Sequence, residues 1–230
     1  MYAKSKHVTG FWVKQSNEQP YIDYTQGVTA AHSLGQLWAI DRHGESCMSD
    51  VEIGWTVSKG QYGDDDPHLF IFAWDCSVGL GYVGQQTVPW VQYSSVIAPN
   101  SVVSHDDTWH TYGVDLYEGN WWFYYDGQWV GYIPPSAWTR FFPSMVEEGE
   151  AGGEVSGPEY ATCTGMGNEG RYGANRDAAM FNKVWYDYGN RSASASLNSY
   201  SSDAQYTTGS WYRGQPGSQF RYGGPGSCAP

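Results

Sequence analysis

The chain has 230 residues, enough for one large β domain or two smaller ones. Its formal net charge is −12 at pH 7, which repels phosphate backbones and excludes nucleic acid as an expected partner. No run of about 18 apolar residues is present, so a membrane-spanning helix is also excluded. Aromatic residues make up 17% of the chain and glycines number 29, a composition that favours pleated sheets over helices.

The N-terminus reads as the start of a processed protein. Met1 is followed directly by polar, ordinary sequence, without the apolar core of a signal peptide. We therefore expect a mature domain over residues 1–230 that is secreted and whose signal peptide and any pro-segment have been removed. An acidic surface loses its self-repulsion as the pH falls, which is compatible with work in acid.

In chain order, the first predicted elements are strands. Residues 10–39 alternate short apolar runs with Ser, Asn, Gly and Pro, the pattern of strands joined by turns. His32–Ile40 alternates so that four side chains share one side: Leu34, Gln36, Trp38 and Ile40. Val51–Val57 alternates more strictly, and its odd-numbered residues form an apolar face. Glu52 therefore points away from the most apolar side.

The middle of the chain gives three more predictions. Leu69–Trp74 is a continuous apolar run, which predicts a strand covered on both faces. Asp126-Gly127 supplies the positive φ angles of a tight turn, so Trp121–Ile133 is predicted to form a β-hairpin. Ser136–Met145 follows two prolines and predicts a short helix.

The C-terminal part of the chain has weaker patterns. Ala178–Val184 is apolar and fits either a strand or a helix. From Asn190 onward the sequence is rich in Ser, Gly, Tyr and Gln, but its aromatic residues give it something to bury. We expect this region to form an ordered, irregular edge of the same domain.

Four cysteines lie far apart in the sequence, without a C-x-x-C pair or a Cys/His cluster. A zinc site is therefore not expected, and we predict no other bound metal. Two disulfides fit an exported protein better. Three pairings are possible, and we favour Cys163–Cys228, which would hold the Gly/Ser-rich end of the chain, together with Cys47–Cys76.

The motifs of common exported hydrolases are absent. The sequence has no G-x-S-x-G and no H-E-x-x-H, and no cysteine has a setting that suggests a reactive thiolate. The six histidines are scattered. His105 and His110 flank Asp106-Asp107, which we interpret as a solvated loop rather than a ligand site.

Carboxylates are the remaining candidates for catalysis. Most lie in loops, such as Asp64-Asp65-Asp66 and Glu147-Glu148, and are interpreted as surface charge, with calcium binding as the alternative. Glu52 and Glu154 differ because each interrupts a segment of glycine and apolar residues. A carboxylate in a strand is costly to bury unless it has partners or a purpose. The sequence around Glu52 and Glu154 leaves open the alternative that each is a solvated or hydrogen-bonded strand residue without a catalytic role.

An ordered set of motifs over roughly residues 30 to 190 resembles the neprosin family. The set comprises Ser33-Leu34-Gly35-Gln36-Leu37-Trp38, Val51-Glu52-Ile53-Gly54-Trp55-Thr56-Val57, Tyr62-Gly63-Asp64, Leu69-Phe70-Ile71-Phe72, Gly119-Asn120-Trp121-Trp122, Val130-Gly131-Tyr132, Gly152-Gly153-Glu154-Val155 and Thr164-Gly165-Met166-Gly167. The family's two catalytic glutamates fall on Glu52, in E-x-G-W, and on Glu154, in G-G-E. Plant members have paired cysteines in one loop that is represented here by Cys76 alone, which suggests a bacterial-type member.

The resemblance implies a fold and an activity. The fold is a jelly-roll-like, all-β sandwich of two antiparallel sheets with little helix, forming one catalytic domain over residues 1–230. The activity is that of an exported glutamic endopeptidase, which hydrolyses peptide bonds on the carboxyl side of proline at acidic pH. The expected partners are proline-containing peptides and proteins. We expect no cofactor, no membrane contact and a monomer.

Two carboxyl groups brought close together cannot both ionise cheaply, so one can act as base and the other as acid. We expect the ionised glutamate to activate a water and the protonated one to assist the scissile carbonyl and the leaving nitrogen. Which glutamate plays which part stays open. Gln36 is a candidate oxyanion donor or a cross-strand hydrogen bond. Three tryptophans are candidates for binding proline: Trp55, Trp121 and Trp122.

The main alternative is a β-sandwich glycoside hydrolase or carbohydrate-binding module, because such folds also carry aromatic grooves and paired acids. One common sandwich glycosidase places its acids at alternating positions of a single strand, and no such E-x-D pattern occurs in this sequence. This absence weakens the alternative without removing it. A non-catalytic wall or adhesion protein is the third interpretation.

Overall fold

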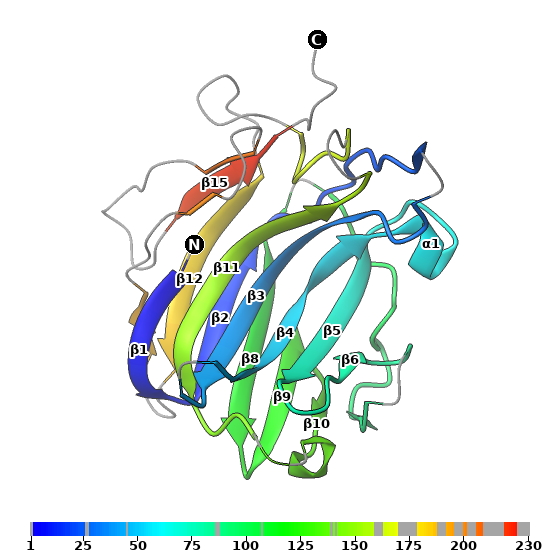
Figure 1. The fold of residues 1–230 in the computed structure, drawn as a ribbon. Helices are drawn as coiled ribbons and strands as arrows, with labels where there is room; N and C mark the ends of the chain where they lie inside the picture. The colour runs from blue at the N-terminus through cyan, green and yellow to red at the C-terminus, as the bar shows by residue number, and fades with distance from the viewer. Residues whose placement is uncertain are drawn as a thin grey trace.

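Two antiparallel β-sheets pack face to face in the computed structural model (Figure 1). The structure describes residues 2–25, 28–44, 46–85, 88–106, 108–138, 140, 142–158, 163–169, 179–187, 192–195, 200–201, 206–208 and 219–224. Its described helical elements are short: α1, Lys59–Tyr62, and the 3₁₀ turn η2, Pro135–Ala137. The prediction of an all-β sandwich with little helix is therefore confirmed.

The first sheet has six described strands. Their bounds are β1 Tyr2–Val8, β3 His32–Arg42, β4 Met48–Val57, β5 His68–Asp75, β6 Gly81–Tyr82 and β11 Val146–Ser156. In space they follow the order β1-β11-β3-β4-β5-β6, with antiparallel neighbours throughout. Because β11 returns to lie beside β3, as Figure 1 shows, side chains far apart in the sequence become neighbours on this sheet.

The second sheet has nine described strands. Their bounds are β2 Gly10–Gln15, β7 Val91–Gln92, β8 His110–Tyr117, β9 Asn120–Tyr125, β10 Gln128–Ile133, β12 Met180–Asp187, β13 Ser192–Ser194, β14 Thr207–Thr208 and β15 Phe220–Gly223. The order is β14-β15-β12-β2-β8-β9-β10-β7, and β13 pairs with β12.

Alternation along the strands builds the core between the two sheets. The predicted apolar face of β4 is fully buried there: Val51, Ile53, Trp55 and Val57. From the other sheet, Trp121 and Phe123 of β9 are equally buried. Because successive side chains of a strand point to opposite faces, Glu52 lies on the outer face of the first sheet.

The predicted hairpin is confirmed. β9 and β10 pair in antiparallel register and are joined by Asp126 and Gly127, whose φ angles are 39° and 86°. Positive φ at both turn positions matches the right-handed twist of the flanking strands. In the segment Ala178–Val184, which fitted either element, the residues from Met180 onward lie in strand β12.

Two predictions for the middle of the chain need correction. The helix predicted over Ser136–Met145 is wrong, because only the short turn η2 is helical in its described part. Trp138 packs edge-on against Phe142 and donates its indole hydrogen to the Trp74 carbonyl, so tertiary contacts hold this segment. β5 is a strand as predicted, but only its core face is fully covered, since Trp74 is 39% exposed.

Covalent links and the C-terminal edge follow the predictions where the structure describes them. The Cys47–Cys76 disulfide is confirmed and joins the start of β4 to the end of β5. Cys163 is also disulfide-bonded, but Cys228 lies outside the described residues, so its pairing stays a prediction. Phe220 and Tyr222 of β15 are buried, which confirms an ordered edge there. Within the described chain, no helix is long and apolar enough to cross a membrane.

Candidate active site

Glu52 projects from β4 onto the outer face of the first sheet, where it is partly buried. Its cross-strand neighbours in register are Trp38 on β3 and Phe72 on β5. Burial of the carboxyl, followed by the like charges of Asp50 and Glu154, raises the pKa of Glu52 well above its usual range. Glu52 is therefore placed to keep its proton in mildly acidic solution.

The side chain of Gln36 is buried beside this carboxyl. We assign its amide so that the nitrogen donates to Glu52 Oε2 at 2.7 Å and the oxygen accepts from Trp38 Nε1 at 3.1 Å, because this orientation satisfies both neighbours. Gln36 thus makes a cross-strand hydrogen bond from β3 to β4. The bond fixes the orientation of the Glu52 carboxyl on the sheet surface.

Glu154 projects from β11 and is more exposed, with 53% of its side chain accessible. Its Oε1 lies 3.3 Å from Nε2 of His32, and Nδ1 of His32 lies 3.0 Å from the Ala30 carbonyl oxygen. A carbonyl oxygen only accepts, so Nδ1 must carry a hydrogen. A hydrogen bond between Nε2 and the carboxyl then needs one further proton, on the ring or on the carboxyl.

Glu52 and Glu154 share the outer face of the first sheet without being in register. Glu52 pairs with Trp38 and Trp38 pairs with Glu150, so Glu154 lies four residues further along β11. The two carboxyls interact electrostatically, since Glu154 is among the charges that raise the pKa of Glu52. Burial, followed by the charges of Glu52 and Glu154, also raises the pKa of Tyr82 to about 12. The glutamates are therefore separate, interacting groups on one surface.

Further carboxyl groups surround this surface. Asp50, two residues before Glu52 on β4, is buried, and burial together with the charge of Glu150 raises its pKa to about 7. Burial is also the main cause that raises the pKa of Glu150. Glu148 is buried rather than solvated and accepts hydrogen bonds from Arg42, at 2.8 Å from Nε and 2.5 Å from Nη2. The interpretation of Glu148 as plain surface charge is therefore wrong.

A family model described as Neprosin matches residues 29–225 of the chain. That range contains both glutamates and their hydrogen-bond partners. The chain belongs to the neprosin family. Membership agrees with the resemblance in the motifs and indicates a peptidase that acts on peptides.

Two aromatic residues of this neprosin-family chain lie beside Glu52 but were not singled out from the sequence. Phe72 of β5 is in register with both Glu52 and Tyr82 of β6. The Phe72 and Tyr82 rings meet edge to face, with centroids 5.0 Å apart and planes at 66°. Alternation along β5 could have placed Phe72, but only once its register with β4 was known. β6 has two residues, too few to give a pattern.

The three tryptophans proposed for proline binding lie elsewhere in the neprosin-family fold. Trp55 is fully buried in the core and donates from Nε1 to the Ser16 carbonyl at 3.0 Å. Trp121 is also fully buried and donates to the Pro143 carbonyl at 2.8 Å. Trp122 is partly exposed, but on the outer face of the second sheet. The structure therefore brings none of them to the surface that carries Glu52.

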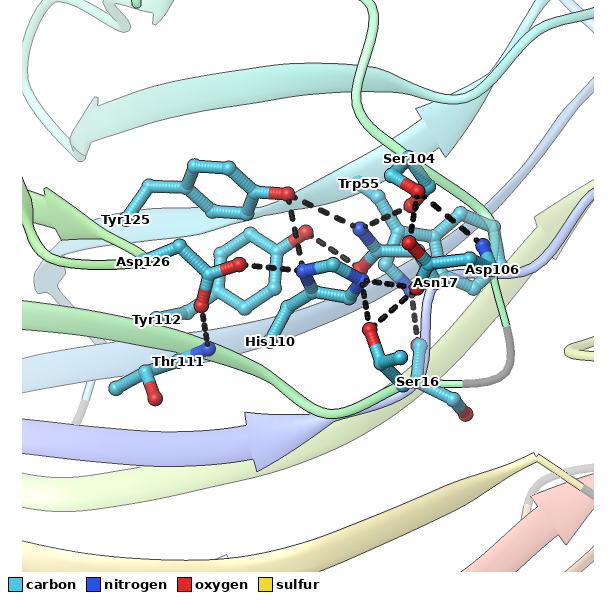
Figure 2. Close-up of polar contacts among 11 residues, drawn as sticks. Ser16, Asn17, Trp55, Ser104, Asp106, His110, Thr111, Tyr112, Tyr125 and Asp126 are labelled. Carbon is cyan, nitrogen blue, oxygen red and sulfur yellow. Dashed lines mark hydrogen bonds and ion pairs between the residues drawn. The ribbon is translucent and has the colours of Figure 1, made fainter.

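A polar network at one end of the sandwich includes His110 (Figure 2). Its Nδ1 lies 2.5 Å from Asp126 Oδ2, and its Nε2 lies 3.4 Å from Asp106 Oδ1. The side chain is 6% exposed, so the interpretation of this histidine as part of a solvated loop is wrong. Burial disfavours the charged ring, but the Asp126 and Asp106 carboxylates outweigh it and raise the pKa of His110.

The same network reaches the core below the glutamate surface. Tyr112 donates to Asn17 Oδ1 at 2.6 Å, and Asn17 Nδ2 donates to the Ser104 carbonyl at 2.8 Å. Figure 2 shows Trp55 and Ser16 beside Asn17. Among the described residues of the neprosin-family chain, no group of three or more His, Cys, Asp or Glu side chains is arranged to hold a metal ion. We interpret the network around His110 and Asn17 as a structural feature that stabilises the fold.

Proposed function

We propose that the chain is a secreted glutamic endopeptidase that hydrolyses peptide bonds on the carboxyl side of proline in acidic solution, with residues 1–230 as one catalytic domain. Glu52 and Glu154 are its catalytic pair. The observation that carries the proposal is the contrast between the two carboxyls. The Glu52 carboxyl is partly buried and has a raised pKa, whereas the Glu154 carboxyl is exposed and contacts His32. Such a contrast is what separates an acid from a base in one site.

Glu52 is the general acid in this proposal. The raised pKa of Glu52 keeps its carboxyl protonated in acid. Because the Gln36 amide donates a hydrogen bond to Oε2, the proton is carried by Oε1. A protonated carboxyl can first form a hydrogen bond to the scissile carbonyl oxygen and later transfer its proton to the leaving nitrogen.

Glu154 is the general base. Protonated His32 donates from Nε2 to Glu154 and stabilises its carboxylate, because Nδ1 is already committed to the Ala30 carbonyl. The carboxylate takes a proton from a water, and the resulting hydroxide adds to the carbonyl carbon. The C–N bond then breaks as Glu52 gives its proton to the nitrogen. Glu154 loses its added proton to solvent, and Glu52 is reprotonated.

Tyr82 is the proposed oxyanion donor. Tyr82 lies on β6, in register with Phe72 beside Glu52, and burial, followed by the charges of Glu52 and Glu154, raises the pKa of its hydroxyl. With a pKa of about 12, it remains a donor throughout the acid and neutral range. A donor aimed at the developing oxyanion stabilises the tetrahedral intermediate in a way that water cannot.

The pair Phe72 and Tyr82 offers an apolar wall for proline. The proline ring is compact and has no N–H, so it favours contact with aromatic side chains over a polar pocket. Phe72 is in register with Glu52, which places this wall next to the proposed acid. The oxidised Cys47–Cys76 pair fits a protein that works outside the reducing cytosol.

Replacing either glutamate tests the catalytic pair. Glu52→Gln and Glu154→Gln should each lower kcat/KM for a proline-containing peptide by about 10²–10⁴-fold at pH 4 to 5, the usual contribution of an acid or base. Product masses should show cleavage after proline in the unchanged protein. Glu147→Gln, an exposed position on the same strand as Glu154, is the matched control and should keep full activity. Normal activity in a folded Glu52→Gln or Glu154→Gln variant would show that the replaced residue is not catalytic. Hydrolysis of β-glucans instead of peptides would favour the alternative function of a glycoside hydrolase.

Removing the aromatic wall tests the specificity. Phe72→Ala should raise KM for peptides with proline before the scissile bond by about tenfold and change kcat less, because it removes substrate contact rather than chemistry. Tyr93→Ala, an exposed aromatic on the second sheet, should leave both constants unchanged. An unchanged KM in Phe72→Ala would show that Phe72 does not contact the proline of the substrate.

A further inference from the structure

A pocket of about 320 Å³ opens on the outer face of the second sheet. Its lining residues come from β8, β9, β10 and the segment after β7: Tyr93, Asp115, Tyr117, Trp122 and Trp129. Trp121 and Phe123 point into the core, so Trp122 between them faces away from the sandwich interior. The pocket is therefore on the opposite side of the molecule from Glu52, and the peptidase mechanism makes no use of it.

The aromatic rings of this pocket stand at right angles to one another. The Trp122 ring meets Tyr93 at 79° with centroids 5.4 Å apart, and meets Trp129 at 80° with centroids 6.0 Å apart. A platform for a flat sugar face would need rings lying in one plane. Edge-to-face contacts instead hold these rings in fixed positions around the pocket, and an aromatic face that borders a pocket attracts a cation.

The carboxyl group of Asp115 also lines this pocket. Asp115 is in register with Trp122, and its buried Oδ1 has no hydrogen-bond partner in the described part of the chain. Burial, followed by the charge of Asp187, raises the pKa of Asp115 to about 6. A bound cation would offset the effects of burial and of the Asp187 charge on the pKa of Asp115, because an opposite charge favours the carboxylate form.

We propose that this aromatic pocket binds a small quaternary ammonium compound of the choline type, with its trimethylammonium group between Trp122, Trp129 and Tyr93 and its charge balanced by Asp115. The volume is at the lower end of the range for ligand pockets, about 300–1,000 Å³, and suits a compact head group. Tyr93 is 67% exposed and Tyr117 58% exposed, so both stand at the mouth.

Calorimetric titration with choline at pH 7.5 tests the proposal. The matched control ligand is 3,3-dimethylbutan-1-ol, which has the shape of choline but no charge. We expect choline to bind at least about tenfold more tightly than the neutral alcohol. Asp115→Asn and Tyr93→Ala should each weaken choline binding by about tenfold. Tyr200→Ala removes a tyrosine that is 68% exposed, close to the 67% of Tyr93, and should bind choline normally.

Four results would overturn the proposal. They are no choline binding at millimolar concentration, equal binding of choline and the neutral alcohol, unchanged choline binding in both pocket variants, and preferential binding of an oligosaccharide or a proline-rich peptide to this pocket. The test is independent of the peptidase proposal. Glu52→Gln should bind choline like the unchanged protein, and Asp115→Asn should keep its peptidase activity.

Discussion

Glu52 and Glu154 carry the same carboxyl group, but the fold gives them different surroundings. Glu52 accepts a hydrogen bond from Gln36, and burial is the main cause that raises its pKa, whereas Glu154 is exposed and contacts His32. The sequence predicts that Glu52 points away from the core, because alternation along one strand is local information. It does not predict His32 as the partner of Glu154, because that contact depends on the pairing of β3 with β11.

The charge of Asp50 should shift the alkaline limit of activity to higher pH. Glu52 acts as an acid only while protonated, so kcat/KM falls as the pH rises through its pKa. Burial is the main cause that raises this pKa, and Asp50 adds to it. Asp50→Asn removes the like charge, so the alkaline limb of the pH profile should move to lower pH by up to about one unit.

The measurement is kcat/KM against pH for both proteins, with folding checked by circular dichroism. Asp65→Asn is the control, because Asp65 is an exposed partner of Lys59 outside the glutamate surface, and its limb should coincide with that of the unchanged protein. An alkaline limb that stays in place in Asp50→Asn would mean that Asp50 does not act on the group that titrates.

Among the elements, glycines inside the two glutamate motifs let neighbouring strands approach closely. A Cβ on Gly54 would lie 2.1 Å from the Gly35 carbonyl oxygen and 2.8 Å from the Gln36 Cα. A Cβ on Gly153 would lie 2.5 Å from the Tyr222 ring. Gly54 therefore brings β3 against β4, which puts the Gln36 amide within reach of Glu52. Gly153 makes room for β15 beneath the strand that carries Glu154.

Gly54→Ala should be more destabilising than Gly153→Ala. At Gly54 the obstacle is backbone, so the paired strands must shift, whereas at Gly153 it is a side chain that can move. Overpacking costs typically about 1–3 kcal/mol, and we expect Gly54→Ala at or above the upper end and Gly153→Ala near the lower end. Urea unfolding at pH 5 measures both. Equal losses in the two variants would mean that backbone approach at Gly54 is not the limiting contact.

Local patterns predicted several elements well, and non-local contacts explain the failures. β4 and the Asp126-Gly127 hairpin were predictable, because alternation and turn chemistry act over a few residues. The helix over Ser136–Met145 was not, because Trp138 is held by Phe142 and Trp74, which are tertiary contacts. The aromatic pair at Phe72 was not predicted either, because only the cross-strand register of β4 and β5 places Phe72 beside Glu52.

At the scale of the whole molecule, the sandwich keeps its two outer faces apart. The first sheet carries the acidic surface with both glutamates, and the second carries the aromatic pocket around Trp122. A polar network around His110 joins the turn between β9 and β10 to the segment that contains Asp106.

This network should stabilise the fold most in mild acid, where the proposed activity lies. The pKa of His110 is raised, so its contribution is fully present below the usual histidine value of about 6.5 and is lost as the pH rises through the folded pKa. Burial alone would raise the pKa of Asp126, but the hydrogen bonds from His110 and Thr111, together with the charge of His110, outweigh burial and lower this pKa. The contribution of Asp126 is therefore lost only as the pH falls through the lowered value. The hydrogen bonds of Ser104 and Thr108 lower the pKa of Asp106 to about 2.

His110→Gln should therefore lower the free energy of unfolding by about 2 kcal/mol at pH 5, the contribution of a charge-assisted hydrogen bond, and by clearly less at pH 9. Urea denaturation of both proteins at pH 3, 5, 7 and 9 measures the difference. His105→Gln changes an exposed histidine of the preceding loop and should leave the unfolding curves unchanged. A difference that is constant from pH 5 to pH 9 would show that His110 stabilises the fold by packing alone.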